Sequence, residues 1–113
     1  MQEIQNEEQL GQAVAASEGQ PVFLFKHSTR CPISAGAKRN VDAYLEKTPD
    51  APPFHMINVV ESRPVALKTA ERLGVEHQSP QLILLKDGKP VWNASHHAIS
   101  EGAINNALQQ HGQ

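Results

Sequence analysis

The residue best suited to carry chemistry is Cys31, the single cysteine among the 113 residues. Proline is favoured at the first position of a helix, so Pro32 predicts that Cys31 is the N-cap of a helix. Unpaired backbone N–H groups and the helix dipole favour a thiolate there, and Lys26, His27 and Arg30 are expected to add positive charge on the same loop. Cysteines in such places titrate at about 3.5–7.5 rather than about 8.5. We therefore expect a reactive thiolate near neutral pH.

Ser34 follows three residues later, where a dithiol oxidoreductase has its second cysteine. A hydroxyl cannot resolve a mixed disulfide, but it can donate a hydrogen bond to a thiolate. Exchange at Cys31 is then expected to stop at a mixed disulfide, which a thiol from another molecule must resolve. Most lone cysteines are small buried apolar residues. The polar segment before Cys31 and the predicted helix start favour the catalytic interpretation.

The elements that position Cys31 follow from the apolar pattern. It predicts α-β-α-β-α-β-β-α, with the first two strands parallel through a right-handed crossover and the last two a hairpin at Asp87-Gly88. We expect one α/β domain over residues 1–113, with a mixed central four-stranded sheet and helices on both faces. This is the element order of the thioredoxin fold. The predicted strands cover residues 21–25, 54–60, 81–86 and 90–93, and the predicted helices begin near Asn6, Cys31, Ser62 and Ser100.

Pro80 opens the third predicted strand after a short loop. Thioredoxin-like folds have a cis-proline at this position, beside the active cysteine. We expect the backbone of Ser79 to pair with the amide groups of a bound thiol, as in strand addition. The Gln81 side chain could hydrogen-bond the same ligand or equally face solvent. The alternative is an ordinary trans proline that starts a strand.

Composition excludes several classes of protein. With 10 basic and 12 acidic residues and 4% aromatics, the chain does not suit binding to nucleic acid or an anionic membrane through bulk charge. No apolar run approaches the ~18 residues that span a bilayer, and no signal peptide is recognisable. One cysteine excludes an internal disulfide. We expect a cytoplasmic protein with no nucleic-acid or membrane partner.

The histidines do not predict a metal site. Metal ligands usually come in closely spaced pairs, and His96 and His97 are the one such pair that could bind a metal together with Cys31 and His77. Because adjacent side chains tend to point apart, this pair is a poor metal site. We expect no bound metal, with His97 at the surface. Trp92 is expected to pack on the face of the sheet.

Three separated segments resemble the monothiol bacilliredoxin family, the thioredoxin-like branch with a C-P-I-S active site. They contain Lys26-His27-Ser28 with Cys31-Pro32-Ile33-Ser34, Val75, His77 and Ser79-Pro80-Gln81, and Val91-Trp92-Asn93 with His96. The resemblance covers residues 21–99. It implies removal of bacillithiol from S-bacillithiolated proteins, with Cys31 attacking and becoming bacillithiolated itself. Free bacillithiol, as co-substrate, or a partner redoxin would regenerate Cys31, and no bound cofactor is expected.

Three further residues can be interpreted beside this resemblance. His96 matches its third segment and is expected to shape the active-site face. Arg63 follows the second predicted strand, at the edge where α/β sheets place ligands, and could pair with the malate carboxylates of bacillithiol. Phe25 stands six residues before the cysteine, where thioredoxins carry a buried acid that assists the second thiol.

Two other functions remain open at this point. One is an iron–sulfur carrier of the monothiol-glutaredoxin type, which also has one active-site cysteine and a serine three residues on. Pro32 replaces the glycine of those proteins and is expected to crowd a bridged cluster. The other is a non-enzymatic module that senses thiols or binds partners on the same fold.

Overall fold

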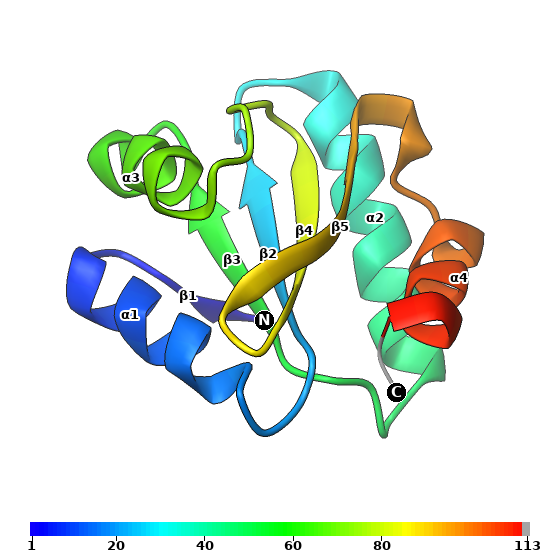
Figure 1. The fold of residues 1–113 in the computed structure, drawn as a ribbon. Helices are drawn as coiled ribbons and strands as arrows, with labels where there is room; N and C mark the ends of the chain where they lie inside the picture. Colours follow the sequence, from blue (N-terminus) through cyan, green and yellow to red (C-terminus); the bar gives the residue numbers. More distant parts are fainter. Residues whose placement is uncertain (112–113) are drawn as a thin grey trace.

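Helices and strands alternate along the chain, which the computed structural model describes over residues 1–111 (Figure 1). The elements are β1 (Gln2–Glu3), α1 (Glu7–Ala16), β2 (Val22–His27), α2 (Pro32–Lys47), β3 (Phe54–Asn58), α3 (Arg63–Leu73), β4 (Gln81–Lys86), β5 (Lys89–Ser95), a short 3-10 helix η1 (His96–Ala98) and α4 (Glu101–His111). No helix in this range is long and apolar enough to cross a membrane.

The strands form one mixed sheet in the order β1-β3-β2-β4-β5. β2 and β3 are parallel, whereas β4 is antiparallel to both β2 and β5. The prediction of four strands is wrong by one, because β1 adds a fifth in parallel with the start of β3, Gln2 lying opposite His55. β1 has only two residues, both polar, so it shows no apolar alternation that a sequence pattern could detect.

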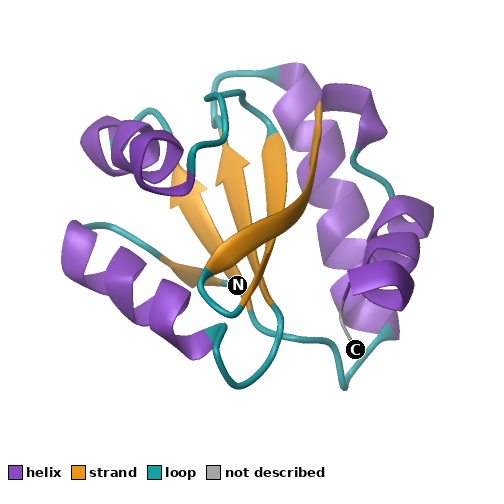
Figure 2. Ribbon diagram, in the orientation of Figure 1, coloured by secondary structure: helices purple, strands orange, loops and turns teal. Residues whose placement is uncertain are grey.

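Helices cover both faces of the sheet, as predicted (Figures 1 and 2). α1 and α3 lie over one face, where they pack on Val22 and Leu24 of β2. α2 and α4 lie over the other face, where Phe23 and Phe25 enter a second core cluster. All four of these β2 side chains are fully buried. A strand covered on both sides needs apolar residues at every position, which explains the continuous run in the sequence.

Trp92 belongs to the second face, as predicted. Its ring meets Phe23 edge to face at a centroid distance of 6.4 Å and packs against the second core cluster. It therefore helps to close the side of the sheet that carries α2, the helix that begins beside Cys31.

Candidate active site

Cys31 is the N-cap of α2, with Pro32 at the first helical position. Its backbone is extended (φ −115°, ψ 121°), and its carbonyl accepts the first helical hydrogen bond from Ala35 at 3.0 Å. The thiol is partly exposed and, among residues 1–111, makes no side-chain capping hydrogen bond. The sulfur therefore lies at the start of a helix and is open to an incoming disulfide.

Ser34 is fully buried in the first turn of α2 and is hydrogen bonded away from the sulfur. Its Oγ lies 2.7 Å from His27 Nδ1 and accepts a hydrogen bond from the Ser28 backbone N–H at 2.9 Å. Neither partner is Cys31, so the expected hydrogen bond from this hydroxyl to the thiolate is not what the structure contains. Ser34 instead joins the end of β2, the following loop and the start of α2, which holds Cys31 in place.

His27 is not the loop cation that the sequence suggested. It is the last residue of β2, is 7% exposed and stacks on Phe25 at 5.7 Å. Burial, followed by the charge of Lys38, lowers its pKa below the ordinary 6.5. The imidazole is therefore neutral at pH 7, and Nδ1 can accept the proton of the Ser34 hydroxyl.

Lys26 is also a strand residue rather than a loop residue, and it is fully buried. It pairs with Ile57 of β3 and with Gln81 of β4. Its Nζ lies 3.1 Å from His77 Nδ1. Burial lowers the pKa of Lys26 from 10.5 to about 8.

Lys26 should make stability depend on pH. Between about pH 8 and pH 10.5 the unfolded chain binds more protons than the folded one, so stability rises with pH by up to about 3 kcal/mol. Denaturant unfolding at about pH 7.5 and about pH 9.5 measures this rise, below the range in which the raised pKa of Tyr44 opposes it.

We expect Lys26→Met to remove most of this pH dependence, because methionine fills the site without a titrating group. Lys89→Met, which changes an exposed strand lysine, is the matched control and should keep the wild-type slope. A slope retained by Lys26→Met would show that another group causes it.

His77 lies in the loop between α3 and β4, and its tautomer follows from Lys26. An ammonium group only donates, so His77 Nδ1 accepts and the neutral ring carries its proton on Nε2, on the side away from Lys26. Burial, then Lys26 and Arg63, lower the pKa of His77 below 6.5. The neutral ring is therefore the form present at pH 7.

The Ser79–Pro80 peptide bond, at the end of the same loop, is cis. The Pro80 carbonyl accepts a hydrogen bond from the His96 backbone at 3.0 Å, which ties the end of β5 to this loop. The interpretation of Gln81 as a ligand-binding residue is wrong. Its side chain is 1% exposed, and its Nε2 donates to the Glu76 carbonyl at 3.0 Å. Gln81 therefore supports the loop from beneath.

Two pockets flank the Cys31–Pro32 bond. The first, called the cysteine pocket below, has a volume of about 420 Å³. The second, the helix pocket, measures about 460 Å³ and contains no part of Cys31. The cysteine pocket is lined by Ser28, Arg30, Cys31, Val59, Val60, Arg63, His77 and Ser79. We assign the chemistry to this pocket, although it is slightly smaller, because it contains the sulfur.

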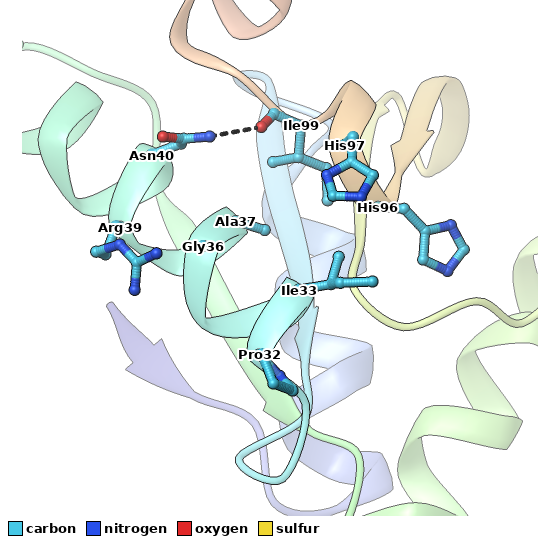
Figure 3. Close-up of a pocket in the computed structure, with 9 residues that line it drawn as sticks. All are labelled: Pro32, Ile33, Gly36, Ala37, Arg39, Asn40, His96, His97 and Ile99. Carbon is cyan, nitrogen blue, oxygen red and sulfur yellow. Dashed lines mark hydrogen bonds between the residues drawn. The ribbon is translucent and has the colours of Figure 1, made fainter.

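The helix pocket lies between α2 and η1 (Figure 3). Asn40 Nδ2 donates to the Ile99 carbonyl at 3.0 Å and joins the two sides. Ile33 is 40% exposed at its edge. The rings of His96 and His97 point in different directions, and both residues are exposed. His96 thus lines the helix pocket together with Pro32 and is not part of the cysteine pocket, so its expected role on the active-site face stays a prediction.

The cysteine pocket brings together four residues that the sequence singled out and adds His77; the four are Arg30, Cys31, Arg63 and Ser79. In the sequence, His77 belonged to the second segment of the resemblance and to a rejected metal site, but it was given no role in binding. Its position three residues before Pro80 was the available signal, because that loop must lie near Cys31 once the fold is known. Within residues 1–111, no three His, Cys, Asp or Glu side chains gather as a metal site.

Known proteins share this arrangement of elements. A family model described as monothiol bacilliredoxin BrxC matches residues 2–104. The chain is similar to a solved thioredoxin-fold oxidoreductase, with a TM-score of 0.82 and 30% identity over 94% of this chain and 91% of the other.

Two solved thioredoxins are more distant. The Fasciola hepatica protein has a TM-score of 0.78 and covers 98% of this chain and 99% of its own. NaTrxh from Nicotiana alata has a TM-score of 0.77, with 99% of this chain and 92% of its own covered. Each is 19% identical, which shows the thioredoxin fold alone.

Proposed function

Because this chain belongs to the monothiol bacilliredoxin family, whose members are thiol oxidoreductases of the thioredoxin fold, we propose that it removes bacillithiol from protein mixed disulfides through Cys31. The observation that carries the proposal is the partly exposed sulfur of Cys31 in a pocket of about 420 Å³. Small-molecule sites usually measure about 300–1,000 Å³. The pocket thus has the size for a small thiol, while the protein half of a mixed disulfide stays outside.

The first step is attack by the Cys31 thiolate on the bacillithiol sulfur of the mixed disulfide. A bond forms between these two sulfurs as the bond to the protein sulfur breaks. The electron pair leaves with the protein sulfur, which takes a proton from solvent. Cys31 then carries bacillithiol, and the client cysteine is free.

The second step needs a thiol from another molecule, because Ser34 occupies the place of a resolving cysteine. A free bacillithiol thiolate attacks the bacillithiol sulfur on Cys31, which produces bacillithiol disulfide and restores the Cys31 thiolate. Alternatively, one thiolate of a partner redoxin attacks the bacillithiol sulfur and releases the Cys31 thiolate; its second thiol then expels free bacillithiol and leaves a disulfide in the redoxin. The route uses bacillithiol as a co-substrate, has no step that requires a bound cofactor, and suits the reducing cytoplasm.

Intact-mass spectrometry tests the proposal. After the reduced protein is mixed with a bacillithiolated client, Cys31 should gain the mass of one bacillithiol while the client loses it. Excess free bacillithiol should then remove the added mass from Cys31 and leave the client unmodified. A client that stays modified, or an accumulating protein–protein disulfide, would contradict this route. An adduct on Cys31 without turnover under substrate excess would indicate a thiol sensor instead.

A further inference from the structure

We propose that Arg30, Arg63 and His77 form a carboxylate-binding subsite in the cysteine pocket, which selects small thiols that carry a dicarboxylate. In bacillithiol this group is the malate. The inference rests on the function proposed above and identifies the part of the thiol that the protein recognises.

The first argument is the charge of the pocket lining, which contains two guanidinium groups and no carboxylate. Arg30 and Arg63 are both exposed, and within residues 1–111 neither takes part in an ion pair. Glu61, which accepts a hydrogen bond from Thr29 at 3.2 Å, is not among the lining residues. Both guanidinium groups are thus available to an anion that enters the pocket.

The second argument is the placement of Arg63 at the first position of α3. A cation at a helix N-terminus is electrostatically unfavourable, because the dipole is positive there. α1 and α4 carry acidic residues in their first turns, whereas α2 and α3, which begin beside the cysteine pocket, carry none. Positive potential therefore accumulates around Cys31 at some cost to the fold, and an anionic ligand would offset that cost.

The third argument is the set of hydrogen-bond donors beside the guanidinium groups. His77 presents its Nε2–H on the side away from Lys26, and Lys26 adds a buried ammonium behind the ring. The Ser79 hydroxyl oxygen is buried and has no partner among residues 1–111. These groups supplement the two guanidinium groups.

The chemistry of these groups favours a dicarboxylate. Guanidinium groups bind carboxylates through paired N–H···O hydrogen bonds, so two of them match two carboxylates. Phosphate is the other anion that guanidinium groups bind well. A test must therefore separate a thiol that carries malate from one that carries phosphates.

The test compares kcat/KM on one client protein modified with three thiols: bacillithiol, its malate-free cysteinyl-glucosamine part, and coenzyme A. Wild type should act on bacillithiol at least about tenfold better than on the malate-free thiol, since hydrogen bonds to charged groups are the stronger ones. Arg63→Gln and Arg30→Gln should each remove most of this preference. Both substitutions also reduce the positive potential around Cys31, so they should slow removal of the malate-free thiol too, but by a smaller factor than removal of bacillithiol.

Two controls carry the same charge change elsewhere. Arg72→Gln alters the last turn of α3, and Arg39→Gln alters the helix pocket. Both should keep the wild-type preference.

Three results would overturn the subsite while leaving the proposed function standing: equal slowing of bacillithiol and the malate-free thiol by Arg63→Gln, loss of preference in Arg39→Gln, or faster removal of coenzyme A. Failure of wild type on all three modified clients would instead refute the proposed function.

Discussion

Replacing Cys31 with serine is expected to lower the removal of bacillithiol from a modified client by at least about a thousandfold. The chain contains no other thiol, and a hydroxyl at this position is almost entirely protonated near neutral pH. The disulfide between residue 31 and the small thiol, which is the product of the first step, therefore cannot form. The measurement is the rate at which the client loses bacillithiol, followed by mass spectrometry.

This variant should fold, which makes the loss of activity interpretable. Cys31 is an N-cap residue without a side-chain capping bond to any residue in the range 1–111, and serine is among the preferred N-caps. We expect its Tm to equal or exceed that of wild type. Activity within tenfold of wild type in the folded variant would remove Cys31 from the mechanism.

Converting Ser34 to cysteine is expected to change the end point of the reaction. A second thiol in the first turn of α2 can attack the mixed disulfide on Cys31 and expel bacillithiol. His27, which is neutral and 2.7 Å from the Ser34 oxygen, can accept the new thiol's proton. The bacillithiol adduct should fall at least about tenfold in abundance. In its place a Cys31–position 34 disulfide should form, which is two hydrogen atoms lighter than the reduced variant.

Ser34→Ala is the matched control for this experiment. Both variants lose the hydroxyl that bonds His27 and Ser28, at a cost of about 1–3 kcal/mol in stability, although a thiol can still donate weakly to His27. Only the cysteine variant gains a thiol, so the adduct should persist in Ser34→Ala. Equal adduct levels in the two variants would mean that the residue at position 34 cannot reach the disulfide.

Local signals made the position of Cys31 predictable from the sequence. A proline directly after Cys31 specifies a helix start, and the fully apolar β2 run specifies a strand covered on both faces. These two features place Cys31 at the junction of a strand and a helix. The place of Pro80 in the fold was predicted from its position after the third helix. That prediction needs only the order of the elements and no knowledge of side-chain packing.

The polar residues around Cys31 were harder to place, because their partners are distant in sequence. Lys26 and His27 look like loop residues, yet both belong to β2 and are buried, Lys26 between β3 and β4 and His27 beside β3. The contact between Lys26 and His77 spans 51 positions, and no periodic pattern encodes it. Gln81 lies opposite Lys26 on β4, so it was buried for the same reason.

The position of β1 has a practical consequence for engineering. β1 pairs with the beginning of β3, whereas Val59 and Val60, just past the end of β3, line the cysteine pocket. The start of the chain therefore lies at the end of the sheet away from the cysteine pocket, and Figure 1 shows the N mark at the opposite end of the strands from the start of α2. A fluorescent reporter or a surface attachment joined on the β1 side of the sheet would leave the sulfur accessible, so this side suits the attachment of a redox biosensor.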